Sequence, residues 1–229
     1  KNTLIISIAL TIFSFPAPIL LAICLDNIPR QGFKRAAQTI SYLPHFISWV
    51  VMAGLVYRLL DTDTGIVKYI IRSLGCDPIP FMRTPSMFLP IVIIVDILKE
   101  VGWNSIIFLA AITNIDSSLY EAARIDGAGK LKCIWYITLP GIGPTIGTML
   151  ILRVGSMVNV NFDMIFNLKN PMIDSVANVL GTFVYEQGIL WGKFSYATAV
   201  GMVQGLISVI LVFITMKAAN KVSGESYIV

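Results

Sequence analysis

Charged side chains are scarce in this sequence, and their scarcity decides the class of protein. Only 13% of the 229 residues are Asp, Glu, Lys or Arg. A soluble domain of this size carries about a quarter. Hydrophobic residues make up 56% of the chain and gather in long runs, and a run of about twenty is enough to cross a bilayer. The deficit of charge therefore excludes an ordinary soluble domain and indicates a polytopic membrane protein.

Histidine and cysteine are also rare, which excludes most metal and redox sites. His45 is the only histidine, so a His-based metal site or a Ser/His catalytic pair would have to include it. Cys24, Cys76 and Cys133 show neither metal-ligand nor redox spacing. We therefore expect no metal centre and no enzymatic activity in this chain. For His45 itself, a hydrogen-bonded structural role near a membrane boundary is the simpler interpretation.

The apolar runs are continuous, which selects helices over strands. A backbone in lipid has no water to bond, so its spans are helices or a closed barrel. The alternating pattern of a barrel strand is missing. We predict an all-α membrane bundle that forms a single domain over residues 1–229. Its five expected spans cover about residues 2–25, 39–60, 86–112, 134–157 and 195–216.

Local signals add detail to these spans and to the segments between them. The net charge of +4 does not indicate nucleic acid here, because Lys and Arg near span ends fix orientation. Basic residues predict that loops 26–38 and 113–133 and the C-terminus are cytoplasmic. Pro16 predicts a kink in the first span, and Gly143 with Gly147 predicts close helix packing. We expect outer connectors at 61–85 and 158–194, with short helices at 64–74 and 176–185.

A short charged segment lies between the third and fourth spans. Ser118 followed by Glu121 fits a capping box, which predicts the start of a helix. Gly127 and Gly129 predict its end, because glycine adopts a left-handed turn without strain. We expect a helix over about residues 117–130 outside the bilayer, before the chain re-enters at Pro140.

Several charges fall inside the predicted spans. A charge at bilayer depth is costly and usually faces protein or water. Asp96, Lys99 and Glu100 are three or four residues apart, so we expect them to share one helix face. Two interpretations stay open. The charges line a translocation path, with Trp103 as a stacking surface, or they form structural ion pairs, such as Arg153 with Asp96 or Glu100.

The charged segment resembles the EAA loop of permease subunits in binding-protein-dependent ABC importers. The matching residues are Glu121, Ala122, Ala123, Asp126, Gly127, Ala128, Leu139 and Pro140. Other stretches resemble the sugar-uptake branch of that family, namely Asn2-Thr3-Leu4, Tyr42-Leu43-Pro44 and residues 100–104. Asn159, Phe166-Asn167-Leu168 and Asn170-Pro171 resemble the oligosaccharide and polysaccharide permeases of Gram-positive bacteria.

The resemblance implies a fold and a set of partners. It implies the type I ABC importer permease fold in a bacterial cell membrane. A second homologous permease would complete a heterodimer, and an extracytoplasmic solute-binding protein would deliver the sugar. ATP and Mg²⁺ would bind a separate dimeric ATPase, into which the EAA helix docks; Gly129-Lys130 lacks the upstream glycine of a phosphate loop. This branch usually has one more span before Asn2, so we expect an N-terminal span to be missing.

The resemblance also turns the intramembrane polar residues into path candidates. Sugars need planar hydrogen-bonding groups and aromatic faces, which the spans offer. The candidates are Asp96, Lys99, Glu100, Trp103, Asn104, Arg153, Asn159 and Asn161. Two alternatives stay open: an ABC permease for peptides or amino acids, and an ion-coupled secondary transporter that uses the charges as a relay. The second leaves the EAA segment unexplained.

Overall fold

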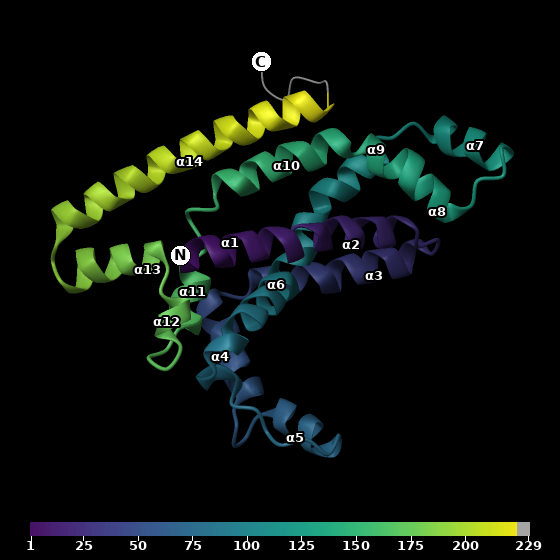
Figure 1. The fold of residues 1–229 in the computed structure, drawn as a ribbon. Helices are drawn as coiled ribbons and strands as arrows, with labels where there is room; N and C mark the ends of the chain where they lie inside the picture. Colours follow the sequence, from purple (N-terminus) through teal and green to yellow (C-terminus); the bar gives the residue numbers. More distant parts are fainter. Residues whose placement is uncertain (224–229) are drawn as a thin grey trace.

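The computed structural model describes residues 1–223, and this part of the chain consists of helices and the loops between them, without strands (Figure 1). Its α-helices are α1 (Asn2–Phe13), α2 (Pro16–Asp26), α3 (Gln31–Tyr42), α4 (Trp49–Leu60), α5 (Ile66–Ser73), α6 (Pro85–Thr113), α7 (Ser117–Ile125), α8 (Lys130–Cys133), α9 (Leu139–Gly141), α10 (Gly143–Gly155), α11 (Phe162–Leu168), α12 (Asp174–Ala177), α13 (Leu180–Tyr185) and α14 (Phe194–Ser223). Four short turns of 3₁₀ or π-helix join them: η1 (Leu43–Phe46), η2 (Phe81–Arg83), η3 (Ile134–Thr138) and η4 (Glu186–Leu190). The C-terminal end predicted to be cytoplasmic, residues 224–229, lies outside the described residues.

Helix α6 is the element around which the others pack. It is 29 residues long and contacts α1, α2, α3, α10 and α12. Near its start, Phe88 and Val92 belong to one apolar cluster, built with α1, α4 and α11. Near its end, Phe108 and Ile112 belong to a second cluster, built with α2 and the α9–α10 junction. The charged middle of α6 therefore lies between two apolar cores.

Two helical runs have no sharp bend and are long and apolar enough to cross a membrane. They cover residues 2–26 and 194–219. They coincide with the first and last predicted spans. The first run is interrupted at Ser14 and Phe15, directly before Pro16 and so where the kink was expected. The amide of Phe15 donates to the carbonyl of Leu10, five residues back, which widens the helix locally.

The second predicted span, residues 39–60, is wrong as a continuous helix. Helix α3 begins at Gln31, inside the segment expected to be a loop, and the run 31–46 meets α4 at an angle of 99°. Helix α3 ends just before Pro44, which lies in the first turn of the 3₁₀-helix η1. Ile47 and Ser48 are then extended, and the Ser48 hydroxyl accepts from the amide of Val51 to cap α4.

The fourth predicted span, residues 134–157, is also wrong as a straight helix. The run 130–141 bends by 59° against α10. Ile142 lies at the bend, between two glycines and before Pro144, which forms the first turn of α10. Helix α8 and the π-helical η3 precede the bend, so Pro140 lies inside a helical run rather than at its start.

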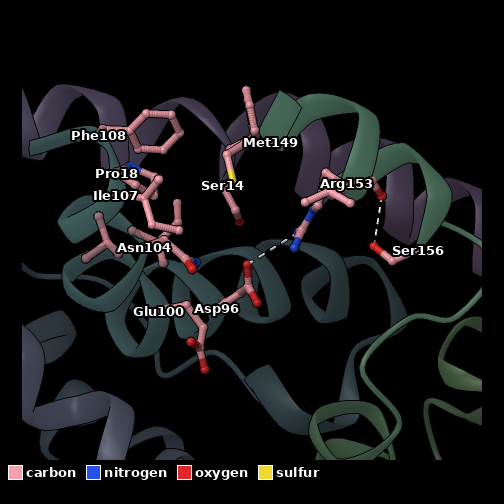
Figure 2. Close-up of a pocket in the computed structure, with 14 residues that line it drawn as sticks. Ser14, Pro18, Asp96, Glu100, Asn104, Ile107, Phe108, Met149, Arg153 and Ser156 are labelled. Carbon is pink, nitrogen blue, oxygen red and sulfur yellow. Dashed lines mark hydrogen bonds and ion pairs between the residues drawn. The ribbon is translucent and has the colours of Figure 1, made fainter. Parts of the chain in front are cut away.

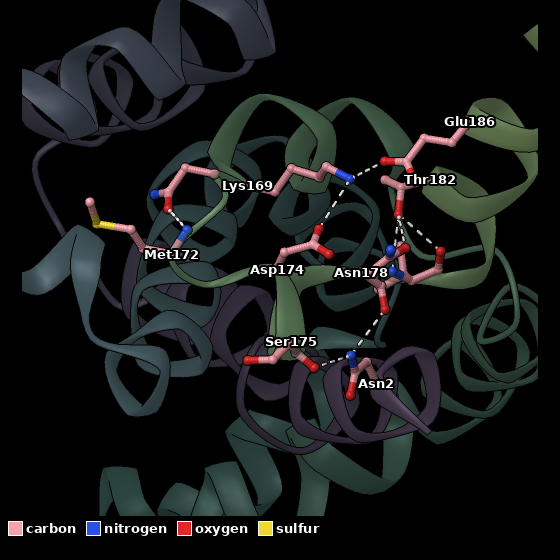
Figure 3. A network of polar contacts seen from close by, with 10 residues as sticks. Asn2, Lys169, Met172, Asp174, Ser175, Asn178, Thr182 and Glu186 are labelled. Carbon is pink, nitrogen blue, oxygen red and sulfur yellow. Dashed lines mark hydrogen bonds and ion pairs between the residues drawn. The ribbon is translucent and has the colours of Figure 1, made fainter. Parts of the chain in front are cut away.

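The connector 158–194 is more structured than expected. The helix predicted over 176–185 is split at Asn178 into α12 and α13. Polar contacts stabilise this region, as Figure 3 shows. The side-chain amide of Asn2 donates to the backbone carbonyls of Ser175 and Asn178, and Lys169 forms ion pairs with Asp174 and Glu186. Helix α11 is part of the core rather than a surface segment, because Met164, Ile165 and Leu168 are fully buried.

Close helix packing occurs at a glycine that the sequence pattern did not single out. A Cβ built on Gly143 meets nothing within 4 Å in the described chain, so the packing expected at Gly143 and Gly147 stays a prediction. A Cβ on Gly102 of α6 would lie 1.9 Å from the carbonyl oxygen of Ser41 in α3. Glycine at 102 therefore sets the distance between α3 and α6. In the outer connector, α5 ends before Gly75, whose φ of +79° favours glycine, as expected.

Candidate functional site

The middle of α6 presents its polar side chains in two directions. Asp96, Glu100 and Asn104 are four residues apart and line one cavity. Lys99 and Trp103 point to the other side, toward η1 and the start of α4. The expectation that all the charges share one face therefore holds only in part: Lys99 lies beside Glu100, but it is directed toward His45 and Trp49 rather than into the cavity with Asp96.

An ion pair joins α6 to α10 across the cavity (Figure 2). Arg153 Nη2 lies 3.7 Å from Asp96 Oδ2. The Asp96 side chain is 9% exposed and the Arg153 side chain is 33% exposed. The sequence analysis left Asp96 and Glu100 open as partners of Arg153, and the structure pairs Arg153 with Asp96. The acid of the pair is buried and the cation borders the cavity.

The cavity has two adjoining lobes that share Asp96, Glu100, Asn104, Arg153 and Ser156. The first lobe, about 240 Å³, is closed by the interruption between α1 and α2 and by α10. The second lobe, about 300 Å³, extends toward Asn159 and Asn161. Six of the eight path candidates thus line one space, and Lys99 and Trp103 do not.

Lys99 and Trp103 form a second cluster around the single histidine. His45 Nδ1 lies 2.8 Å from Glu100 Oε2, and its ring stacks on Trp103 with centroids 4.4 Å apart. Lys99 is buried, donates to the carbonyl oxygen of His45 at 2.5 Å, and lies 3.5 Å from Glu100 Oε1. Glu100 therefore has compensating contacts on the side away from the cavity. This cluster holds η1 against α6.

The two asparagines of the second lobe also have structural partners. The Asn161 side chain accepts from the amide of Met164 and caps α11. Asn159 accepts from the side-chain amide of Gln204, a buried residue of α14. Gln204, Ser14 and Ser156 are polar residues of this region that sequence reasoning missed, because a single small or neutral polar residue in an apolar run carries no distinctive signal.

The EAA-like segment forms a short exposed helix at one extremity of the molecule (Figure 1). Helix α7 starts with Asp116 as its cap, whose carboxylate accepts from the amide of Ser118, so the predicted capping box is wrong. This bond holds the pKa of Asp116 below its usual value. The helix ends before Gly127, whose φ is +77°, whereas Gly129 starts α8 at a φ of −73°.

The matching residues of this segment divide into an exposed group and a packed group. Glu121, Ala122, Asp126 and Gly127 are exposed, whereas Ala123 and Ala128 are half-buried. Leu139 is half-buried and packs against the second apolar cluster, and Pro140 beside it is exposed. A bond of 2.9 Å between the hydroxyls of Tyr120 and Thr138 ties α7 to η3. A cavity of about 650 Å³ lies beside this bond and reaches the end of α2.

The described residues contain no cluster of three or more His, Cys, Asp or Glu side chains that fits a metal ion. The chemistry of both regions is therefore hydrogen bonding, charge and packing. The second lobe is mainly polar, whereas apolar side chains make up most of the first lobe. The carboxylate, guanidinium, amide and hydroxyl groups that line them suit a hydroxyl-rich solute with apolar ring faces.

Comparison with known proteins places these features in a family. Residues 14–225 match the family described as the binding-protein-dependent transport system inner membrane component. The chain is 42% identical to the polygalacturonan/rhamnogalacturonan transport system permease protein YteP of Bacillus subtilis (strain 168), over 98% of this chain and 70% of YteP. It is 39% identical to protein LplB of the same organism, over 98% of this chain and 71% of LplB.

Solved structures give the same result. The chain superimposes on a chain in the crystal structure of a bacterial alginate ABC transporter in complex with alginate pentasaccharide-bound periplasmic protein. The TM-score is 0.95 at 38% sequence identity, and the match covers 99% of this chain and 78% of that chain. At this identity and coverage, the likeness extends to the whole arrangement of helices around the cavity.

Proposed function

The chain belongs to the family of binding-protein-dependent transport system inner membrane components, and we propose that it is the permease subunit of an ATP-driven oligosaccharide importer in a bacterial cell membrane. The likeness along the whole chain to polysaccharide permeases carries this proposal. The names of these relatives favour sugar over peptide or amino acid, and the EAA segment favours ATP-driven transport over an ion gradient.

The polar cavity between α6 and α10 is the proposed contribution of this chain to the translocation path. Asp96, Glu100, Asn104 and Arg153 supply donors and acceptors for sugar hydroxyls. A second permease subunit would face the open side of this cavity and complete the path. An extracytoplasmic binding protein would release the sugar into it.

Helix α7 is the proposed docking element for a separate ATPase, which would bind ATP and Mg²⁺. Its exposed face includes Glu121, and Ile125 is 87% exposed, so the described chain leaves a charged and apolar surface for a partner. In this arrangement α7 and the C-terminus face the cytoplasm, and α5 faces outward. A push on α7 would reach α6 through the Tyr120–Thr138 bond, η3 and the packing of Leu139.

Reconstitution tests this proposal. The chain is purified with its second permease and ATPase, placed in vesicles with the binding protein, and supplied with labelled oligogalacturonide or a labelled peptide. We expect ATP-dependent uptake of the sugar only. Uptake that needs an ion gradient and no ATP, or uptake of the peptide instead, would refute the assignment.

A matched pair of glycine variants tests the role of α7. Gly127→Val and Gly75→Val both place a branched side chain at a positive φ, near +77° and +79°, in open space. Because only Gly127 ends α7, Gly127→Val should lower the sugar taken up per ATP hydrolysed, and Gly75→Val should not. Equal ratios for the two variants would count against coupling through α7.

A further inference from the structure

The cation of the cavity is more accessible than the acid it faces. Among the residues that line the two lobes, Arg153 is the only cation. Its Nη2 atom lies 3.7 Å from Asp96 Oδ2, beyond the range of about 2.7–3.2 Å for a hydrogen bond. A guanidinium has five N–H donors, and this contact satisfies none of them. A solute in the cavity therefore meets Arg153 before it meets Asp96.

A buried hydroxyl borders the same space. Ser14 is 8% exposed, and its Oγ lies close to the Asp96 carboxylate. It lies at the interruption between α1 and α2 and lines the first lobe. Figure 2 shows its hydroxyl directed toward the Asp96–Arg153 pair. Asp96 can accept from this hydroxyl, so Ser14 supports the acid of the pair and leaves the guanidinium of Arg153 as the cavity's charged donor.

Glu100, the other acid of the cavity, repels an anion less than a free carboxylate would, because its charge is partly compensated by its neighbours. Glu100 lies against His45 at 2.8 Å and Lys99 at 3.5 Å on the side of α6 that faces η1. Asp96 is nine-tenths covered by its neighbours. An anionic group in the first lobe thus faces the Arg153 guanidinium, the Ser14 hydroxyl and the Asn104 side chain.

We propose that Arg153 binds the carboxylate of a uronate residue as an acidic oligosaccharide passes through the cavity. A planar guanidinium pairs with a carboxylate through two parallel bonds, which the hydroxyls of a neutral sugar do not reproduce. The inference rests on the proposed transport function and adds the substrate class. It makes Arg153 a specificity residue, and it makes Asp96 the acid that competes with the substrate carboxylate for the guanidinium.

The test compares one oligosaccharide in two charge states. Vesicles that contain the complete complex are supplied with an oligogalacturonide or with its carboxyl-reduced form, which has the same length and linkage but no charge. The ratio of the two uptake rates is measured for the native protein, Arg153→Gln, Arg153→Lys and Asp96→Asn. Selectivity of the binding protein is common to all variants, so it cancels when the ratios are compared.

The expected changes have opposite signs. Arg153→Gln should lower the ratio of acidic to reduced sugar at least tenfold, and Arg153→Lys should lower it less, because lysine keeps the charge but not the planar pair of donors. Asp96→Asn should raise the ratio, because it removes the competitor. If Arg153→Gln and Asp96→Asn reduce both uptake rates alike, the pair is structural and the inference is wrong. If the native complex takes up neither sugar, the proposed function itself fails.

Discussion

A methyl group at Gly102 would strike the backbone of α3. An ideal Cβ there lies 1.9 Å from the carbonyl oxygen of Ser41 and 2.4 Å from its carbonyl carbon. A carbon-oxygen contact is comfortable at about 3.3–3.6 Å, so the two helices must separate by about 1.5 Å to restore it. Because the oxygen belongs to a helix backbone, no side-chain rotation relieves the contact.

The cost of Gly102→Ala can be worked out from two opposing effects. Overpacking costs about 1–3 kcal/mol, and a rigid backbone neighbour puts this site at the upper end. Alanine regains about 1 kcal/mol of helix propensity. The net loss is about 2 kcal/mol, which for a chain of this length lowers the unfolding midpoint by about 4–8 °C.

Gly54→Ala is the matched control for this experiment, because a Cβ there meets nothing within 4 Å. It receives the propensity gain without the clash, so its midpoint should equal or exceed that of the native protein. Thermal unfolding of the purified protein, followed by intrinsic fluorescence, measures both variants. If Gly102→Ala unfolds at or above the midpoint of Gly54→Ala, the close approach of α3 and α6 is wrong.

Three further predictions concern polar contacts. Asp116→Ala should speed amide hydrogen exchange in α7, whereas Asp116→Asn keeps the cap. Because the folded pKa of Asp116 is lowered, its stabilisation is present above the ordinary value of about 3.9 and is lost as pH falls through the lowered one. The difference in α7 amide protection between the native protein and Asp116→Ala, measured at the same pH, should therefore be full at neutral pH and shrink as the pH falls below that ordinary value. His45→Ala removes the hydrogen-bond partner of Glu100 and should lower the free energy of unfolding by about 2 kcal/mol. His45→Gln should restore part of that stability. A native-like thermal midpoint for His45→Ala would refute the stabilising role of this bond. Tyr120→Phe should lower uptake per ATP, and the exposed Tyr136→Phe should not; equal ratios would exclude that route of coupling.

Helices α6 and α14 could be located because the sequence marks their starts clearly. Helix α6, expected over 86–112, covers Pro85–Thr113, since an apolar run starts at a proline and stops before a polar turn. Helix α14 begins at Phe194, one residue before its predicted start. The 99° bend before α4 could not be predicted. Proline is tolerated in membrane helices, and both sides of Pro44 mix polar with apolar residues, so hydropathy does not register the change of direction.

The cavity could be predicted only in part, and for a related reason. The cost of an unpaired charge at bilayer depth predicts that Arg153 has an acidic partner, and the structure gives Asp96. The separation of Lys99 from Asp96 was not predictable. The charges on α6 spread over about 100° of the helix surface, and which neighbour each one meets depends on where η1 lies. Ser14 gave no signal, because its role depends on a helix interruption.

The interruptions and the polar cavity belong to one arrangement. In a lipid environment, irregular backbone is tolerated only where it is buried in protein or lines a water-filled space. The interruption between α1 and α2 places Ser14 and Phe15 in the cavity wall, and the one between α10 and α11 places Ser156 and Asn159 there. Both interruptions border the charged middle of α6, between its two apolar clusters. Helices that served only to anchor the chain would gain nothing from such breaks at one level of α6. Their convergence on Asp96 and Arg153 agrees with the proposed path, because water or solute in such a space would both satisfy the freed backbone groups and solvate the charges.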